Sequence, residues 1–374
     1  MSGKKVIALV TDAIHPYSRG GKEIRYHELA KRLAARGDVH VFTMHWWDGP
    51  PTIRRDGVTY HALCRTIPMY KGARRSIRQA LVFAFACLGL LRHRFDVIEA
   101  DHMPYLPVFA CKVVAALRRT RLVVTWHEVW GDDYWRAYLG RLGTVAWCVE
   151  RLAMRLPDTI LAASAHTADR LRAVLGAGAD VVVAPNGIDL DLVRAASPAA
   201  TRADIVVVGR LMEHKRVDLL LDAVARLRDR GRAVTCLVIG DGPERENLAA
   251  KARELGLGSA VRFRHDVAGQ EQLYGLMKGA KVFAAPSARE GFGVAVLEAL
   301  ACGMPVVTTD APDNLARHLV RRSARGRVCA ATPGAFADAI AAALAEPRTG
   351  VVEDWVEQFG WDATADVAAK AVLA

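Results

Sequence analysis

Residues 290–298 read Glu290-Gly291-Phe292-Gly293-Val294-Ala295-Val296-Leu297-Glu298, and they follow the apolar run Val282–Ala284. This order predicts a strand, a small-residue loop and then a helix over Phe292–Cys302. Glycines let the backbone approach a ligand closely, and the N–H groups at a helix start form an anion site. Glu298 lies about five residues into the helix, roughly 7–8 Å along its axis. A diphosphate at the helix start would therefore leave Glu298 placed for ribose hydroxyls and Glu290 for sugar hydroxyls. Two ordinary surface glutamates are the alternative interpretation.

Short β-branched runs alternate with longer helical patterns on both sides of this stretch, which is typical of parallel α/β units. In the first half, strands are predicted at Val6–Val10, Val39–Phe42, Val58–His61, Val97–Glu99, Leu122–Thr125, Thr159–Leu161 and Val181–Val183. In the second half, they are predicted at Ile205–Val208, Thr235–Ile239, Val261–Phe263, Val282–Ala284 and Val306–Thr308. Further helices are predicted at Glu23–Ala35, Val217–Arg230, Glu244–Leu255, Glu271–Lys278 and Asp362–Leu373.

The length of 374 residues suggests two domains. Between the two halves, Asn186-Gly187-Ile188-Asp189 predicts a turn, and the Ala/Ser/Pro-rich run Ala195–Thr201 follows it. We therefore predict an N-terminal domain over residues 1–185, a linker over 186–203 and a C-terminal domain over 204–350. Residues 351–374 are expected to form C-terminal helices that can cross back to the first domain.

A second candidate site lies in Gly209-Arg210-Leu211-Met212-Glu213-His214-Lys215, directly after the first predicted strand of the second half. Residues just beyond the carboxyl end of a strand face the crevice where α/β sheets bind ligands. An arginine fork and a lysine point charge suit a diphosphate, and they would stabilise it as a leaving group. A solvated basic loop is the alternative.

The first half contributes two weaker candidates. Ser18-Arg19-Gly20-Gly21-Lys22 has paired glycines that open a helix, although a plain turn explains them equally well. His127 ends a predicted strand on the ligand side of the sheet, where it can contact a transferred sugar or pass a proton. His102 occupies a similar place, but a lone histidine is more often structural. An aromatic cluster suits either a sugar ring or core packing, and it comprises Trp126, Trp130, Tyr134 and Trp135.

The formal net charge of +11 favours anionic partners such as nucleotides, nucleic acid or an acidic membrane, although scattered surface arginines explain it as well. No nucleic-acid-binding module is recognisable, so nucleic acid is not expected as a partner. The seven cysteines form no C-x-x-C pair and no zinc-like spacing. They predict a reducing compartment and no metal site.

Two apolar segments bear on localisation. The N-terminal run is too short for a signal peptide, and Ala80–Leu91 falls short of the roughly 20 apolar residues of a spanning helix. We therefore expect a cytoplasmic protein. The basic segment Lys71–Arg78 leads into Ala80–Leu91, and together they suggest either an interfacial helix on the inner face of the membrane or a buried helix with a basic start.

Taken together, these motifs resemble the family 4 retaining glycosyltransferases. Glu290 and Glu298 match the E-x7-E signature, with Ala299–Val307 after it; Gly209-Arg210 with Lys215, Asn186–Asp189 and Gly20-Gly21 also match. The resemblance spans nearly the whole chain and implies the GT-B fold, an α/β architecture of two Rossmann-like domains facing across a cleft that holds the active site. It further implies transfer from a nucleoside-diphosphate sugar with retention and without a metal or other cofactor.

The resemblance also implies residue roles. Arg210 and Lys215 would bind the donor diphosphate, with Gly21 lining the phosphate side. Glu298 would bind the ribose, and Glu290 with Gly291, Phe292 and Gly293 would bind sugar and phosphates. His127 would contact the sugar near the reacting carbon. Glu290 and His127 are therefore the catalytic candidates.

Substrate identity is less constrained. Thr308–Asn314 stands where many family members have a small-residue turn, and it leaves the nucleotide base and the sugar of the donor unspecified. Glu128-Val129-Trp130, by contrast, resembles the corresponding segment of actinobacterial antibiotic-pathway transferases. The expected reaction moves a hexose or amino-sugar from a UDP- or GDP-type donor to a small-molecule hydroxyl. Alternatives are a membrane-surface mannosyl- or glycosyltransferase acting on a lipid or polysaccharide, and a nucleotide-sugar epimerase. A nicotinamide enzyme is disfavoured because no G-x-G-x-x-G follows the first strand.

Overall fold

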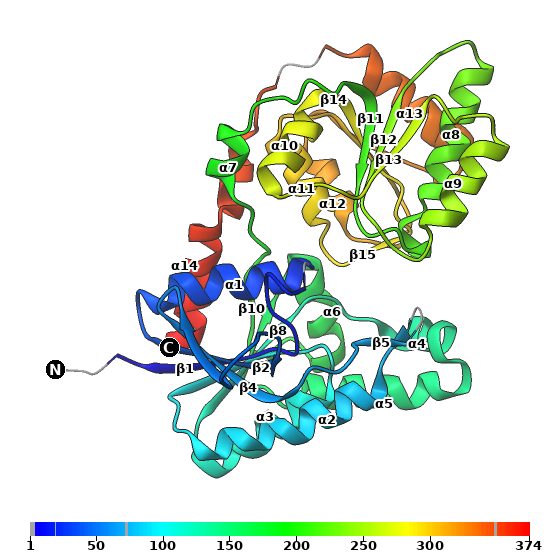
Figure 1. The fold of residues 1–374 in the computed structure, drawn as a ribbon. Coiled ribbons are helices and arrows are strands. Elements are labelled where there is room, and N and C mark those ends of the chain that lie inside the picture. The colour runs from blue at the N-terminus through cyan, green and yellow to red at the C-terminus, as the bar shows by residue number, and fades with distance from the viewer. Residues whose placement is uncertain (1–3, 19, 72–73, 348–349) are drawn as a thin grey trace. The chain divides into compact units, whose positions relative to one another are not determined.

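The computed structural model describes residues 4–18, 20–71, 74–347 and 350–374, which form two compact units (Figure 1). The first unit joins the chain up to Gly187 with Trp361–Ala374, and the second is Ile188–Gly360. Arg19 of the expected glycine segment, and Gly72 and Ala73 of the expected interfacial segment, lie outside the described residues.

The first unit is built on one eight-stranded sheet. All neighbouring strands are parallel except β3, which pairs antiparallel with β4 at one edge. In sheet order the strands are β10 (Val181–Val183), β9 (Thr159–Ala162), β8 (Arg121–Trp126), β7 (Val97–Asp101), β1 (Val6–Val10), β2 (Asp38–His45), β4 (Val58–Arg65) and β3 (Thr52–Arg55). A separate two-stranded ribbon joins β5 (Tyr70–Lys71) and β6 (Arg74–Arg75).

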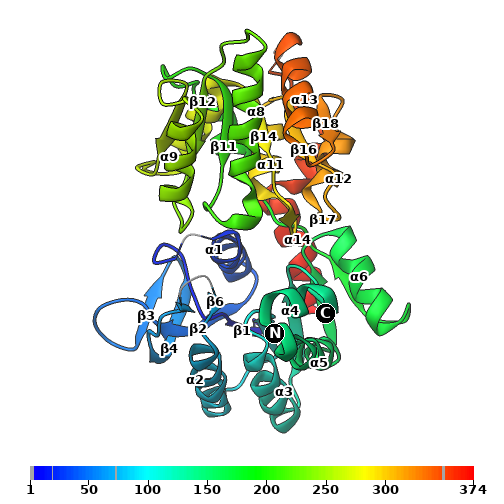
Figure 2. The same ribbon diagram turned by 90° about the vertical axis from the view of Figure 1, so that its right-hand side faces the viewer.

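Helices cover both faces of this sheet (Figure 2). On one face, α1 (Gly21–Ala34) packs with α14 (Trp361–Leu373) over one apolar core. The other face carries a second core, formed with α2 (Ile77–Cys87), α3 (Leu106–Arg118), α5 (Gly143–Met154) and α6 (Ala165–Leu175). Shorter elements are α4 (Gly131–Leu139) and the 3-10 turns η1 (Leu88–Arg92) and η2 (Gly140–Leu142).

The second unit holds a six-stranded sheet whose strands are all parallel. Its order is β13 (Val261–Arg264), β12 (Cys236–Ile239), β11 (Ala203–Val208), β14 (Ala280–Ala285), β16 (Val306–Thr309) and β18 (Gly326–Cys329). Counted along the chain from β11, this is the Rossmann order 3-2-1-4-5-6, in which the strand order reverses between β11 and β14. Short strands β15 (Arg289–Glu290) and β17 (Asp313–Asn314) pair beside it.

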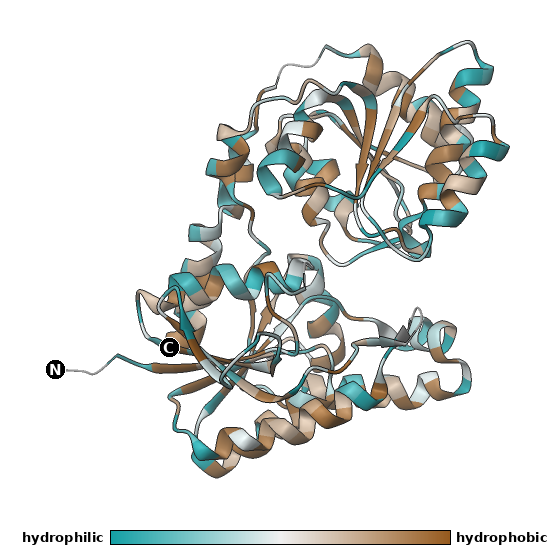
Figure 3. Ribbon diagram, viewed as in Figure 1, coloured by the Kyte–Doolittle hydropathy of each residue, from teal (hydrophilic) through white to brown (hydrophobic). Residues whose placement is uncertain are grey.

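Two apolar cores flank the second sheet, whose strands are strongly hydrophobic (Figure 3). One core is formed with α8 (Val217–Asp229), α9 (Arg245–Glu254) and α13 (Pro333–Ala345). The other is formed with α7 (Leu190–Ala195), α10 (Gln270–Gly279), α11 (Val294–Ala301), α12 (Ala316–Arg322) and η4 (Asp354–Phe359). The remaining element, η3 (Glu213–Lys215), follows β11.

The α/β prediction with two Rossmann-like halves is confirmed, and each expected strand overlaps a strand of the two sheets. The edge strands β3 and β18 were not predicted. Both lie at a sheet edge and are largely half-exposed or exposed, so they lack the continuous apolar run that identifies a buried strand.

The boundary between the units differs from the expected linker. Residues 188–203 belong to the second unit, where Asp189 caps α7 by accepting a hydrogen bond of 2.9 Å from the Leu192 N–H. Val193 of α7 is buried in the core. The helices that order this segment, α10 and α11, are distant from it in the sequence. Its own Ala/Ser/Pro-rich composition therefore predicted a linker.

The C-terminal residues divide between the units. η4 belongs to the second unit, and α14 packs on α1 of the first, where Asp362 forms an ion pair of 2.5 Å with Arg32. Among the described residues, no helix combines the length and apolar character needed to cross a membrane.

Candidate active site

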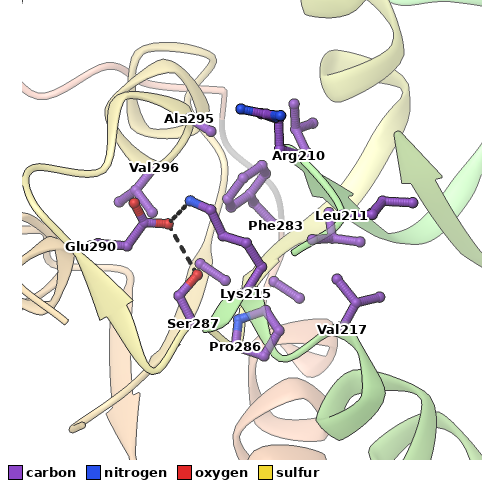
Figure 4. A pocket seen from close by; sticks show the side chains of 15 residues that line it. Arg210, Leu211, Lys215, Val217, Phe283, Pro286, Ser287, Glu290, Ala295 and Val296 are labelled. Carbon is purple, nitrogen blue, oxygen red and sulfur yellow. Dashed lines mark hydrogen bonds and ion pairs between the residues drawn. The ribbon is translucent and has the colours of Figure 1, made fainter. Parts of the chain in front are cut away.

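A pocket of the second unit opens between the carboxyl ends of β11 and β14, at the reversal of strand order (Figure 4). Polar groups in its wall come from Arg210 and Lys215 after β11, and from Ser287 and Glu290 after β14. Ligands of open α/β sheets bind at this kind of reversal because the adjoining loops diverge there and leave a crevice. The tertiary structure therefore brings together three residues that the sequence predicted separately, namely Arg210, Lys215 and Glu290.

Glycines hold the Gly209–Leu211 backbone in place. A Cβ on Gly240 would lie 1.9 Å from the Gly209 carbonyl oxygen, and one on Gly242 would lie 2.4 Å from that of Leu211. The loop after β12 can therefore pack directly on this segment, and the Leu211 N–H donates to the Asp241 carbonyl at 2.9 Å. This support was not predicted, although Gly240-Asp241-Gly242 directly after a strand is a usable signal for a tight loop.

Lys215 and Glu290 form an ion pair at the centre of the pocket, and the Ser287 hydroxyl donates to Glu290 Oε1 at 3.0 Å. Burial acts to raise the pKa of Glu290, but the Lys215 charge and the two hydrogen bonds outweigh it and lower the pKa. Glu290 is thus an anion that already occupies part of the hydrogen-bonding capacity of Lys215.

The segment after β16 supports Glu290 from behind. β15 and β17 pair so that Glu290 lies opposite Asn314, and the Leu315 N–H donates to the Glu290 carbonyl at 2.9 Å. The fully buried Asn314 amide donates to Thr308 Oγ1 and to the Thr309 carbonyl, each at 2.9 Å. The unusual Thr308–Asn314 sequence therefore has a structural role in positioning Glu290.

Gly293 begins α11 with φ of +90°, a conformation that favours glycine. A Cβ at this position would lie 2.4 Å from Ala316 Cβ, so the close approach of α12 also requires a glycine at position 293. The preceding Phe292 is buried, with its ring centroid 5.8 Å from that of Phe359. Its side chain belongs to the core, which leaves Gly291, Phe292 and Gly293 only backbone N–H groups to offer an anion.

Glu298 is 7% exposed and lies outside the residues that line the pocket. Its Oε1 accepts a hydrogen bond of 3.0 Å from the hydroxyl of the fully buried Tyr274 on α10. Burial raises the pKa of Glu298 to about 7, against the opposing effect of this hydrogen bond. With Glu290 in an ion pair and Glu298 enclosed, the alternative of two ordinary surface glutamates is wrong.

The first unit has its own polar cluster where its strand order reverses, between β1 and β7. Lys22, in the first turn of α1 beside Gly21, forms ion pairs with Asp12 at 2.6 Å and with Asp101 at 2.5 Å. Burial acts to lower the pKa of Lys22, but the two carboxylates raise it. Arg75 adds a second cation 2.8 Å from Asp12. The role of Lys22 was not predicted, because a lysine after two glycines reads equally well as a surface residue.

His127 follows β8 as expected and lies next to this cluster, with Nε2 3.6 Å from Asp101 Oδ1. Burial lowers its pKa to about 3, although the Asp101 charge opposes this, so its imidazole is neutral at physiological pH. His102 is also buried, with Nδ1 3.4 Å from the same Asp101 oxygen. Asp101, His102 and His127 offer ligand atoms within 4.8 Å of one another. Any metal ion held there would compete with the Lys22 ammonium for Asp101.

The aromatic cluster after His127 is largely structural. Trp126 and Trp135 are buried in the core, and the Trp135 indole N–H donates to the fully buried Glu150 at 2.7 Å. Trp130 is half-buried, with its ring centroid 4.6 Å from that of Trp135. A stacking surface for a sugar ring is thus restricted to the more exposed members, Trp130 and Tyr134.

Comparisons with known proteins agree with this geometry. A family model described as "Glycosyltransferase Family 4" matches residues 19–192, and one described as "Glycosyl transferases group 1" matches residues 192–358. Among solved structures, a sucrose-phosphate synthase from Thermosynechococcus elongatus covers 98% of both chains at 21% identity with a TM-score of 0.78. The Anabaena protein HepE in complex with UDP and glucose covers 99% of both chains at 19% identity with a TM-score of 0.74. At these identities the likeness shows the fold.

Curated relatives match shorter stretches. A 2-deoxystreptamine glucosyltransferase from Streptomyces kanamyceticus is 31% identical over 57% of this chain and 59% of its own length. A GDP-mannose-dependent alpha-(1-6)-phosphatidylinositol dimannoside mannosyltransferase from Mycobacterium tuberculosis is 33% identical over 42% of this chain and 40% of its own. The matched part of the chain therefore spans about half the length of these relatives. Since the two family models together match residues 19–358, the chain belongs to the family 4 glycosyltransferases with the GT-B fold.

Proposed function

We propose that this protein transfers a hexose or amino-sugar from a UDP- or GDP-type nucleoside-diphosphate sugar to a hydroxyl of a small-molecule acceptor, with retention of configuration and without a metal ion. One observation carries the proposal: Arg210, Lys215 and Glu290 meet in a pocket at the strand-order reversal of the second unit. That unit contains the whole match to the glycosyl transferases group 1 model.

Neutralising the leaving group is the main contribution assigned to the second unit. The donor diphosphate would lie at the start of α11, where the N–H groups around Gly291–Gly293 and the helix dipole favour an anion. Arg210 and Lys215 would balance the charge that develops as the bond from the anomeric carbon to the diphosphate oxygen breaks. Both cations lie in the pocket wall.

The ion pair between Lys215 and Glu290 suggests an exchange of partners on donor binding. A diphosphate is a stronger ligand for an ammonium group than one carboxylate, because it carries more charge. Once Lys215 turns to the phosphates, Glu290 becomes available to accept hydrogen bonds from sugar hydroxyls. Glu298, in its deprotonated form, would accept the ribose hydroxyls.

The proposed transfer step follows the resemblance to the retaining family. The acceptor oxygen would bond to the anomeric carbon on the face from which the diphosphate leaves, and a departing phosphate oxygen would take the acceptor proton. His127 would contact the sugar near the reacting carbon. Its depressed pKa supports a role as a neutral hydrogen-bonding group.

A lipid or polysaccharide acceptor is the second candidate. The mycobacterial relative is named for a phosphatidylinositol dimannoside acceptor, and the first unit exposes a group of large apolar side chains on its helices. A nucleotide-sugar epimerase is distinguished directly, because it would convert the donor with no acceptor present.

The test combines thermal shift with turnover. Ligand that binds only the folded protein raises the melting temperature, so UDP, GDP and their sugars are screened with and without EDTA. Lys215→Ala is expected to abolish the shift and to lower kcat by about 100-fold or more. Lys251→Ala is the matched control, because Lys251 forms an ion pair of 2.7 Å with Asp222 on α8, outside the pocket. Normal binding and turnover in Lys215→Ala would contradict the proposal.

A further inference from the structure

Helix α2 exposes a row of large apolar side chains to solvent. Ile77, Leu81 and Phe85 recur every four residues and are 66%, 56% and 78% exposed. The opposite side of the helix, with Phe83 and Cys87, is buried in the core of the first unit. The core is formed by the buried side of the helix, so the exposed row does not contribute to it. An ordinary amphipathic helix presents polar residues there.

The neighbouring helices repeat this pattern. α3 packs against α2 and exposes Val113 and Leu117, and α5 exposes Val145 and Leu152. Figures 1 and 2 show α2, α3 and α5 along the same side of the first unit. Their outward side chains thus form one surface, which we call the α2/α3/α5 surface. Large contiguous apolar patches on soluble domains generally mark an interaction site.

Cations predominate on this surface, although the exposed Asp96 and Asp158 lie beside it and Asp158 forms an ion pair of 2.9 Å with Lys112 of α3. The sequences of α2, η1, α3 and α5 contain a single carboxylate, Glu150, which is fully buried. The exposed cations on these helices and on the residues beside them are Arg78, Arg92, Arg94, Arg118, Arg119, Arg141, Arg151 and Arg155. The exposed helix α9 of the second unit, by contrast, mixes Lys251 and Arg253 with Glu246 and Glu254.

We propose that the α2/α3/α5 surface docks on an anionic lipid bilayer. Apolar side chains flanked by arginines fit a bilayer, where the side chains enter the acyl boundary and the cations meet anionic headgroups. A second copy of the chain fits less well, because a two-fold interface would bring arginines against arginines. The proposal does not rest on the transfer reaction, since docking is measured without donor or acceptor. It would, however, place a lipid acceptor within reach of the first unit.

Vesicle sedimentation tests the apolar part of the proposal. The full chain is expected to pellet with vesicles of phosphatidylglycerol and phosphatidylcholine, and to stay in solution with pure phosphatidylcholine. Phe85→Ser combined with Leu117→Ser should lower partitioning by about tenfold or more, because both side chains lose their burial in lipid. The control is Val351→Ser, which removes a 62% exposed apolar side chain from the second unit.

The charged part is tested with Arg78→Ser and Arg92→Ser, each expected to weaken partitioning roughly fivefold at low salt. Arg253→Ser on α9 is the matched control and should pellet as the unmodified protein does. Circular dichroism shows that each variant is folded. Three outcomes would overturn the proposal: no pelleting with anionic vesicles, unchanged pelleting of the Phe85/Leu117 variant, or a dimer in solution that this variant converts to monomer.

Discussion

At the scale of single residues, the candidate site depends on opposite electrostatic outcomes for two buried glutamates. Glu290 and Glu298 both lose solvent, which favours the protonated form. Lys215 reverses this effect at Glu290, whereas within the described part of the chain the Glu298 side chain is hydrogen-bonded to a neutral tyrosine hydroxyl. The same residue type on either side of one glycine loop is thus an anion in one place and half-protonated near neutrality in the other.

The raised pKa of Glu298 predicts that the stability of the second unit depends on pH. Its folded pKa of about 7 lies above the ordinary value of 4.5, so its contribution to stability is present below about pH 4.5 and is lost as pH rises through 7. Glu298→Gln stays neutral and should stabilise the second unit by up to about 3 kcal/mol at pH 8, with no gain at pH 4. Thermal denaturation at both pH values measures this.

The same variant separates stability from binding. Nucleoside-diphosphate affinity of the unmodified protein should rise between pH 6 and pH 8, as Glu298 loses its proton, and this rise should be absent in Glu298→Gln. Glu254→Gln, on the exposed side of α9, is the control and should change neither profile. An equal gain in stability at pH 4 and pH 8 would show that Glu298 does not titrate as described.

At the scale of elements, the start of α11 depends on the contact with α12. Gly293→Ala would place a methyl group 2.4 Å from Ala316 Cβ at a backbone φ of +90°. We expect a loss of about 1–3 kcal/mol in stability from the strained backbone, with weaker nucleotide binding because the N–H groups move. Differential scanning fluorimetry with and without nucleotide measures both effects.

Gly334→Ala in α13 is the matched control for this substitution. Its Cβ would meet open space, so alanine should be neutral or stabilising by roughly 0.5–1 kcal/mol. If the two substitutions had the same effect, the close approach of α12 to Gly293 would not be what demands glycine there.

At the scale of the whole molecule, α14 completes the first unit although it comes last in the chain. Its buried face joins the core around α1, and this face comprises Ala365, Ala368, Ala369, Ala371 and Val372. Ending the chain after Gly360 should therefore lower the melting temperature of the first unit, because apolar surface on α1 becomes exposed. Nucleotide binding by the second unit should persist. Calorimetry with and without nucleotide distinguishes the two units.

Asp366→Ala is the control for this truncation. It removes an exposed ion pair with Arg36 on the outer side of the same helix, and such pairs contribute less than about 1 kcal/mol. A truncated chain that melts like this control would contradict the assignment of α14 to the first unit.

The sequence by itself determined the α/β class, every strand of the two large sheets except β3 and β18, and three residues of the pocket wall, namely Arg210, Lys215 and Glu290. Strand and helix periodicities are local, and a strand followed by glycines and a helix start lies within a few consecutive residues. Only the tertiary structure decided the strand order, the place of α14 and the partners of the buried charges. Lys215 and Glu290 are 75 residues apart in the chain. Such pairs form because the sheet brings distant strand ends to one edge, and no local pattern encodes which charge will meet which.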